Sequence, residues 1–383
     1  MAVTKYNLGQ LLELTTATNS DLKYGVSDVR GMTITKQIIP TKADVETTDL
    51  SKFLVVQSDE FVFNPRTHGK KIGLGYNNSD KAFIISWNNI AFRVKESMKD
   101  IVLSEYLFLH FNREEWDREA CFRSWGSSTE VFSWDALCEM ELYLPSREIQ
   151  KKYVDIYNSM LENQRCYERG IGDLRIVMEG HIDKLRRTCK YDTLANYIEL
   201  SEEKNDSLTY GIESVRGVSI DKKFINTKAD MANVNLRPYY TVHPNDFAYV
   251  SVTSRNGEKI SIALNDTKDT FICSSSYIVF RSKDTTKLLP QYLMLYFSRE
   301  EFNRYARFNS WGSARETFDW ADMLDIKIPI PSEVSEQKYI ANIYNAYQRR
   351  REINEQLKAQ LRDICPILIR GSIEEGARNH VVF

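Results

Sequence analysis

The chain has 383 residues, of which 42% are apolar and 27% charged, as expected for a soluble globular protein of two or three domains. Six cysteines without CxxC spacing and only five histidines support neither a zinc site nor a disulfide framework, and they fit the reducing cytoplasm best. A net charge of -2 argues against a nucleic-acid binder that acts alone. Without an export signal or an apolar run of ~18 residues, no membrane segment is expected.

The first part of the chain predicts short strands. Five β-rich runs, separated by Gly, Asn, Asp and Pro, occupy residues 52–56, 60–63, 71–75, 82–86 and 90–94. Short strands interrupted in this way suggest a curved mixed sheet. Segments 105–112 and 291–298 are rich in Leu, Tyr and Phe and predict helices that pack on such sheets.

Long polar helices with an apolar seam are predicted after Pro145 and again after Pro331. With spacings of three and four, the first seam contains Val154, Tyr157, Leu161, Gln164, Glu168, Ile171, Arg175, Met178, Ile182 and Leu185. The second contains Ile340, Ile343, Tyr347, Arg350, Asn354, Leu357, Leu361, Ile364 and Leu368. Such seams are typical of a coiled coil.

Two unrelated amphipathic helices, each covering its own domain, are the alternative to a coiled coil. Polar groups at the seams favour pairing, because Gln164 and Glu168 would meet Arg350 and Asn354, and polar seam residues can fix register and partner.

The chain is an internal repeat. The segment Tyr24–Gly31 returns as Tyr210–Gly217, and Ser124–Ser127 returns as Ser310–Ser313, both displaced by 186 positions. Solenoid units have ~20 to 50 residues, so this repeat is a whole domain with its connector. We predict two repeated domains at 1–146 and 190–332, a central helical spacer at 147–189, and a C-terminal helical spacer and tail at 333–383.

A basic loop lies between two predicted strands of each repeat. The candidate nucleic-acid contacts are Arg66, Thr67, His68, Lys70 and Lys71 in the first copy and Ser254, Arg255, Asn256 and Lys259 in the second. Arg can pair with guanine, Asn with adenine, and Lys mostly with phosphate. The alternative is a solvated hairpin.

A second candidate cluster surrounds the Ser-Trp-Gly-Ser segment of each copy. It contains Arg123, Ser124 and Ser127 in the first copy and Arg307, Ser310, Ser313 and Arg315 in the second. Glycine admits a phosphate close to the backbone, and hydroxyl and guanidinium groups can donate to it. Alternatively, Trp125 and Trp311 anchor the domain cores. The pairs Glu114–Glu115 and Glu300–Glu301 are surface charge in our interpretation, because neighbouring residues on a helix point apart.

An ordered set of short segments occurs in both copies. In the first copy the segments are Val29–Gly31, Val56–Phe63, Gly69–Ile72, Gly126–Ser127, Leu144–Pro145 and Gln150–Tyr153. In the second copy they are Val242–Tyr249, Gly257–Ile260, Gly312–Ser313, Pro329–Pro331 and Glu336–Tyr339. Together with the helix after each copy, this set resembles the DNA-specificity subunits of Type I restriction-modification systems. One departure is Ser146–Gln150, which stands where that family usually has a Glu-Gln pair.

The resemblance implies an α+β fold, in which two mixed α/β target-recognition domains are separated by two long helices that form an antiparallel coiled coil. It implies a non-catalytic subunit without a cofactor, which reads a bipartite, asymmetric double-stranded DNA target. Its expected partners are two adenine-N6 methyltransferase (modification) subunits that bind S-adenosylmethionine and, in restriction-competent systems, restriction/translocase subunits.

Two other functions stay open: a coiled-coil scaffold independent of DNA, and the recognition part of a fused-type restriction enzyme. The second is disfavoured because Asn64–Thr67, the nearest string to a methyltransferase motif, lacks the second proline and the aromatic residue. The sequence also has no GxxxxGK[ST] loop and no GxGxxG after a strand.

Overall fold

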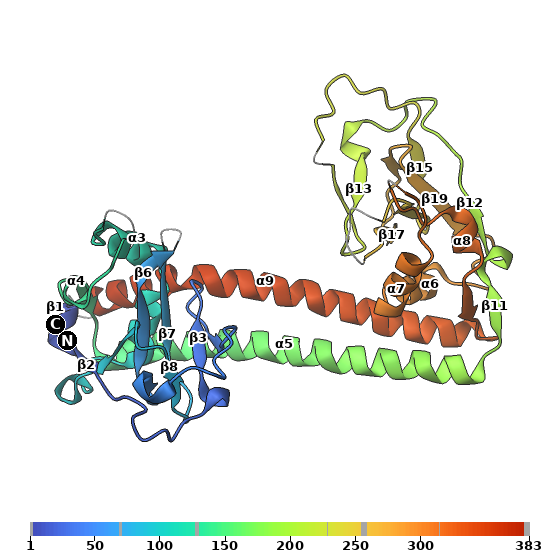
Figure 1. The fold of residues 1–383 in the computed structure, drawn as a ribbon. Helices are drawn as coiled ribbons and strands as arrows, with labels where there is room; N and C mark the ends of the chain where they lie inside the picture. The colour runs from blue at the N-terminus through green and yellow to red at the C-terminus, as the bar shows by residue number, and fades with distance from the viewer. Residues whose placement is uncertain are drawn as a thin grey trace. The chain divides into compact units, whose positions relative to one another are not determined.

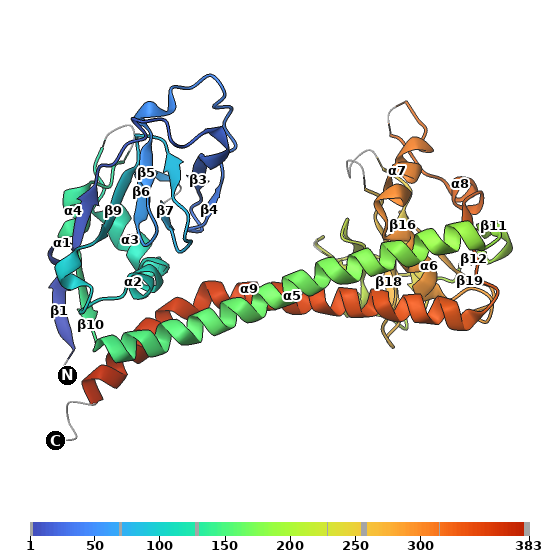
Figure 2. The same ribbon diagram turned by 90° about the horizontal axis from the view of Figure 1, so that it is seen from below.

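The computed structural model describes residues 3–68, 71–126, 130–227, 229–253, 259–313 and 315–378. The chain forms two compact units (Figures 1 and 2). Unit 1 contains residues 1–167 and 353–383, and unit 2 contains residues 168–352. The long helices α5 (Arg147–Thr188) and α9 (Val334–Arg378) each contribute to both units. The domain boundaries expected at 146, 189 and 332 stay predictions.

Unit 1 is built on a four-stranded sheet of order β2-β9-β6-β7. These strands are Leu12–Thr15, Ile90–Val94, Phe61–His68 and Lys71–Tyr76, respectively. Two-stranded pairs surround the sheet: β1 (Thr4–Asn7) with β10 (Glu141–Leu144), β3 (Arg30–Met32) with β4 (Ile38–Pro40), and β5 (Leu54–Val56) with β8 (Phe83–Ile85). The helices are α1 (Leu8–Leu11), α2 (Ser104–Phe111), α3 (Glu114–Phe122) and α4 (Trp134–Cys138).

Unit 2 repeats this topology. Its sheet has the order β12-β19-β16-β17, with strands Ile198–Leu200, Tyr277–Ser282, Phe247–Val250 and Ile262–Leu264. The strand pairs are β11 (Tyr191–Thr193) with β20 (Lys327–Pro329), β13 (Arg216–Val218) with β14 (Phe224–Asn226), and β15 (Tyr240–Val242) with β18 (Phe271–Cys273). The helices are α6 (Pro290–Phe297), α7 (Glu300–Phe308) and α8 (Trp320–Leu324). The predicted repeat is therefore a repeat of structure.

The strands predicted in the first copy are present, with ends shifted by a few residues, but the mixed sheet was wrong. All pairs between named strands in the described parts of the chain are antiparallel. Parallel pairing occurs there only as the isolated bridges of Val29 with Ile84 and of Val215 with Ile272. Consecutive strands that pair, such as β3 with β4 and β13 with β14, are joined by short hairpins, which only antiparallel neighbours allow, whereas parallel neighbours need long crossovers.

Aromatic side chains fill both cores. In unit 1, Phe61 stacks on Phe92 with ring centroids 5.1 Å apart, and in unit 2 Phe247 stacks on Phe280 at 4.8 Å. Helices α2 and α6 cover these sheets and bury most of their Leu, Tyr and Phe side chains, as their composition predicts.

The helices α5 and α9 run antiparallel in each unit, as predicted. In unit 1, Val154 belongs to the same buried cluster as Leu368, while Gln164 Nε2 donates to Asn354 Oδ1 at 2.9 Å. Both amide side chains are buried, so the predicted meeting of polar seam groups is confirmed for this pair. In unit 2, Ile182 of α5 packs in one cluster with Ile340 of α9.

A buried glutamine ties each helix to its own unit. Gln150 Oε1 accepts from the backbone of Leu103 at 3.0 Å, and its Nε2 donates to Ile101 O at 2.8 Å. In unit 2, Gln337 Oε1 accepts from the backbone of Leu289 at 2.9 Å. The sequence segment that departs from the family pattern therefore keeps the residue that makes this connection.

Candidate nucleic-acid interface

The two candidate segments of unit 1 lie side by side. Val131 forms β-bridges with Arg66 and with Trp125, so the end of β6 and the segment after α3 share one small sheet. The backbone N–H of Thr67 donates to Glu130 O at 3.1 Å, and Val131 exchanges two backbone hydrogen bonds with Trp125 at 3.0 and 3.2 Å. Residues that are about 60 positions apart in the sequence thus form a single surface.

Unit 2 builds the same arrangement. Thr317 forms β-bridges with Val252 and with Trp311, and Thr253 N donates to Glu316 O at 2.9 Å. The structure therefore brings both sequence-predicted segments together in each unit. We call these surfaces tip 1 (65–67, 122–126 and 130–132) and tip 2 (251–253, 308–313 and 315–318).

Five candidate residues, Lys70, Ser127, Ser254, Arg255 and Asn256, lie outside the described part of the chain, as does the side chain of His68. The backbone of His68 ends β6 opposite Lys71. At the tips, Arg66, Ser313 and Arg315 are exposed to solvent. Lys259 is also exposed and lines a cavity of unit 2.

The remaining candidates at the tips, and Arg307 next to tip 2, already have partners within the chain. Arg123 Nε lies 3.0 Å from Glu119 Oε1, and Arg307 forms an ion pair with Glu316. The hydroxyls of Ser124 and Ser310 donate to the carbonyls of Ala120 and Ala306 at 2.7 and 2.6 Å, which completes the ends of α3 and α7. Thr67 Oγ1 lies 3.3 Å from Glu130 Oε2. These groups shape the tips as well as offering polar atoms.

Four large aromatic side chains are exposed at the tips. The exposed fractions are 85% for Phe122 and 81% for Trp125 at tip 1, and 79% for Phe308 and 68% for Trp311 at tip 2. The alternative that the two tryptophans anchor the cores is therefore wrong. Leaving one such side chain in water forgoes roughly 1.5–3 kcal/mol of burial. The sequence signal for this feature was Phe-x-Ser-Trp-Gly, present in both copies.

A glycine with positive φ follows each exposed tryptophan. Gly126 has φ 152° and Gly312 has φ 140°, a region that residues with a Cβ rarely occupy. At Gly312 a Cβ would lie 2.3 Å from the carbonyl oxygen of Arg315. These glycines allow the tight turns that return the chain to the small sheet.

A buried lysine at the turn of the β3–β4 hairpin connects it to the body of unit 1. Lys36 Nζ lies 2.7 Å from Asp117 Oδ1. Its counterpart Lys222 donates to Asn303 Oδ1 and to Phe297 O, both at 2.8 Å. Burial lowers the pKa of Lys36 despite the carboxylate of Asp117, and burial lowers the pKa of Lys222 to about 7.

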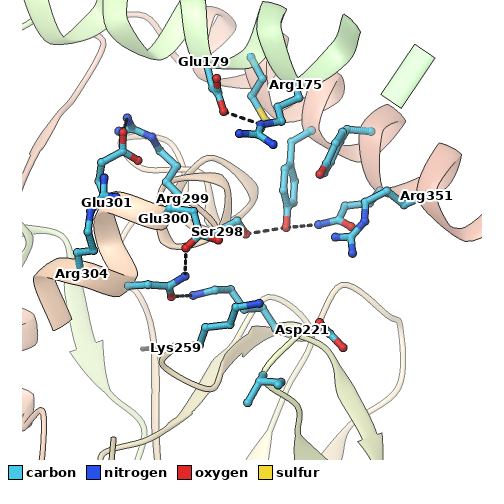
Figure 3. Close-up of a pocket in the computed structure, with 17 residues that line it drawn as sticks. Arg175, Glu179, Asp221, Lys259, Ser298, Arg299, Glu300, Glu301, Arg304 and Arg351 are labelled. Carbon is cyan, nitrogen blue, oxygen red and sulfur yellow. Dashed lines mark hydrogen bonds and ion pairs between the residues drawn. The ribbon is translucent and has the colours of Figure 1, made fainter. Parts of the chain in front are cut away.

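Lys222 borders a cavity of about 640 Å³ within unit 2. Figure 3 shows Arg175 paired with Glu179 at one side of this cavity and the α7 residues Glu300, Glu301 and Arg304 at another. Arg299 is paired with Glu301 at 3.0 Å. The wall of this cavity thus carries charges of both signs, and Arg175 and Arg299 are each paired with a carboxylate.

The acidic residue of each Val-x-x-x-acid segment has a structural role. Glu60 accepts from the backbone of Gln57 at 2.8 Å, and Asp246 accepts from the backbone of His243 at 3.0 Å. Burial raises the pKa of both carboxyl groups. These acids close the turns that begin β6 and β16.

In the ranges that the structure describes, no group of three or more His, Cys, Asp or Glu side chains could hold a metal ion. Over the same ranges, no helix is long and apolar enough to cross a membrane.

Comparisons with known proteins agree with this architecture. Residues 196–363 match the family described as the Type I restriction modification DNA specificity domain. Among curated proteins, none matches the chain significantly. The S subunit of the Type I restriction-modification system from M. genitalium shares the fold, with a TM-score of 0.63 and 12% identity over 97% of this chain and 96% of that one.

Two further solved structures resemble the chain more distantly. The HsdS subunit from Thermoanaerobacter tengcongensis has 14% identity and a TM-score of 0.40, over 97% of this chain and 96% of that one. A chain from a structure of type I R-M complex assembly has 15% identity and a TM-score of 0.45, over 97% of this chain and 98% of that one. Residues 196–363 therefore match a Type I restriction modification DNA specificity domain, and the whole chain shares the fold of the M. genitalium S subunit.

Proposed function

We propose that the chain is the non-catalytic subunit that selects the DNA target of a cytoplasmic Type I adenine-N6 methyltransferase. Tip 1 reads one half of a bipartite, asymmetric double-stranded target, and tip 2 reads the other half. Two modification subunits carry S-adenosylmethionine and the chemistry, and restriction/translocase subunits join them in a restriction-competent complex.

The observation that carries this proposal is the construction of the two tips. Each joins a strand-end segment to the segment after a helix through the same backbone bridges, while the side chains of the loops differ. A common frame with different loop chemistry suits two half-sites with different bases. Arg66 and Lys71 in one copy, against Arg255 and Asn256 in the other, are our candidates for this difference.

The near-zero net charge suggests that other subunits supply part of the cationic surface that binds DNA. Affinity for DNA depends largely on neutralising phosphates, and a chain with net charge -2 has little cationic surplus for that purpose. We therefore expect the modification subunits to supply much of the positive surface. Tight, sequence-specific binding by the isolated chain at physiological salt would contradict this part of the proposal.

The test is to co-express the chain with a cognate modification subunit and to map N6-methyladenine across the host genome. We expect one motif with two unlike halves and an unread gap, with the halves centred about one helical turn apart. Unmethylated DNA despite assembly of the complex would favour a coiled-coil scaffold. Methylation by the chain without any partner would favour the recognition part of a fused enzyme.

A further inference from the structure

Tips 1 and 2 differ in their loops but share one feature that the proposed division into two half-sites does not explain. Both present a Phe and a Trp, three residues apart, to solvent. Single exposed apolar side chains are common on proteins, but two large aromatic ones so close in the chain, repeated at the same place in two units, indicate an interaction surface. A feature that is identical in two recognition modules serves something that both half-sites have in common.

We propose that Phe122 with Trp125, and Phe308 with Trp311, stack on bases of the DNA and support the gap left when the target adenine leaves the helix. This inference rests on the proposed function. The N6 amino group of adenine is hydrogen-bonded to thymine in the duplex, and an active-site pocket cannot enclose a stacked base, so an enzyme that modifies N6 extrudes the base. Extrusion leaves unstacked neighbours, and apolar or aromatic side chains can occupy such a gap.

Stacking fits a feature shared by both units because every base has a π-face. Aromatic contacts therefore tolerate any sequence, whereas contacts from Arg and Asn select particular bases. The invariant aromatic pair would serve the extrusion step at both half-sites, while the variable loops beside it would select the bases.

The backbone that carries the aromatic pairs is held in place by hydrogen bonds and helix ends. Trp125 is held by two backbone hydrogen bonds to Val131, and Trp311 by two to Thr317 at 2.9 and 3.0 Å. Phe122 and Phe308 end the helices α3 and α7. Because this backbone is already ordered, less conformational entropy is lost when an aromatic side chain enters the stack of DNA bases.

DNA is a better occupant of these surfaces than a protein partner because of their neighbours. Exposed Arg66 belongs to the same small sheet as Trp125, and exposed Arg315 lies on the turn between Trp311 and Thr317. Cationic side chains beside flat aromatic ones are the combination used to track a phosphate backbone while stacking on its bases.

The first experiment compares the DNA affinity of the full chain, with its modification subunit, for a duplex that carries the mapped target. We expect the double variant Phe122→Ala with Trp125→Ala to bind roughly 5- to 150-fold more weakly. Trp125→Phe should retain most of the affinity because it keeps an aromatic face. Trp87→Ala is the matched control, since Trp87 is 67% exposed in the same unit but lies outside tip 1.

The salt dependence separates stacking from phosphate contact. Stacking releases no counterions, so the aromatic variants should keep the wild-type slope of log affinity against log salt. Arg315→Ala, which removes an exposed cation beside Trp311, should reduce that slope by about 1. The thermal unfolding midpoint should not fall in the aromatic or the arginine variants, because the side chains that they remove are exposed.

A second readout follows extrusion directly. With 2-aminopurine in place of the target adenine of one half-site, binding of the wild-type complex should raise its fluorescence. The Phe122/Trp125 variant should lose this rise at the half-site of tip 1, and the Phe308/Trp311 variant at that of tip 2.

The inference is overturned if both double variants bind and extrude as the wild type does, and equally if they lose the modification subunit while the chain keeps its DNA affinity. Either result leaves the proposed function standing. If the wild-type chain binds no DNA with or without a modification subunit, the proposed function itself fails.

Discussion

The ammonium group of Lys36 lies 2.7 Å from the carboxylate of Asp117, and the repeat replaces this ion pair by a lysine and a neutral amide, Lys222 with Asn303. We expect Asp117→Asn to cost roughly 3 kcal/mol of unfolding free energy, because it removes one partner of a buried ion pair. Urea denaturation of the variant and the wild type measures this cost. A change under about 1 kcal/mol would mean that Lys36 finds another acceptor.

The two lysines, Lys36 and Lys222, predict a pH dependence of the unfolding free energy with a definite sign. The pKa of Lys222 is about 7 in the folded protein and near 10.5 when unfolded, so the unfolded chain binds more protons between these values. The contribution of Lys222 to stability should therefore rise as the pH increases from about 7 to 10. Asn303→Asp should raise the pKa of Lys222 and so flatten the increase of stability with pH. Asp117→Asn removes the carboxylate beside Lys36 and should steepen the increase of stability with pH that Lys36 causes. Parallel pH profiles for both variants and the wild type would refute the assignment.

The buried side chains of Gln150 and Gln337 are each expected to stabilise the unit in which they make their hydrogen bonds. Gln150 makes hydrogen bonds to Leu103, Ile101 and Pro145, and Gln150→Ala leaves these backbone groups unpaired. We expect a loss of roughly 1–3 kcal/mol from the stability of unit 1. Gln337→Ala should do the same in unit 2, and Gln356→Ala, at an exposed position of the same helix, serves as the control. Protection of amide hydrogens in each unit reports which unit is weakened.

Two glycines should respond to alanine in opposite ways. Gly172 lies inside α5 with open space around it, so Gly172→Ala should stabilise the protein by about 1 kcal/mol through helix propensity. Gly312→Ala places a Cβ against Arg315 O at a positive φ and should destabilise tip 2 by about 1–3 kcal/mol. Thermal unfolding of the two variants checks both signs, and a stable Gly312→Ala protein would show that the turn can rearrange.

The asymmetry of the loops predicts separable specificities. Arg66→Ala should relax the base preference of one half-site, and Arg255→Ala with Asn256→Ala that of the other. The expected cost is roughly 1–3 kcal/mol for each bidentate pair of hydrogen bonds that a substitution removes from a base. Methylome mapping of each variant measures both halves at once. Unchanged preferences in both variants would identify these loops as solvated hairpins and make the segment Ser310–Arg315 the better candidate.

The length of the helices predicts the gap between half-sites. Removing seven residues from both α5 and α9 preserves the seam but shortens each rod by ~10 Å. We expect the unread gap in the methylated motif to change in length. The Gly172→Ala variant, which keeps both helix lengths, should methylate the wild-type motif, and an unchanged gap after the deletions would exclude the helices as a ruler.

The repeat, the strands and the helical seams could be predicted because they follow from periodicity and from residues such as Gln164 and Asn354, whose positions in a heptad fix their neighbours. The antiparallel order of the strands could not, since short β-rich runs carry no direction. Nor could the exposure of Trp125 be predicted. Its burial depends on whether the backbone turns at Gly126 toward the core or away from it, and that is set by hydrogen bonds to Val131, a residue without any distinctive signal.

Unit 1 has a core built from both ends of the chain, with a consequence for its biosynthesis. Cys365, Leu368 and Ile369 lie in the same buried cluster as Phe61 and Trp116, and Tyr106 is hydrogen-bonded to Ser372. A ribosome makes these partners hundreds of residues apart. The continuous segment 168–352 of unit 2 can therefore fold before α9 is complete, whereas unit 1 must wait for the C-terminal part of α9, with its apolar face open to chaperones in the meantime.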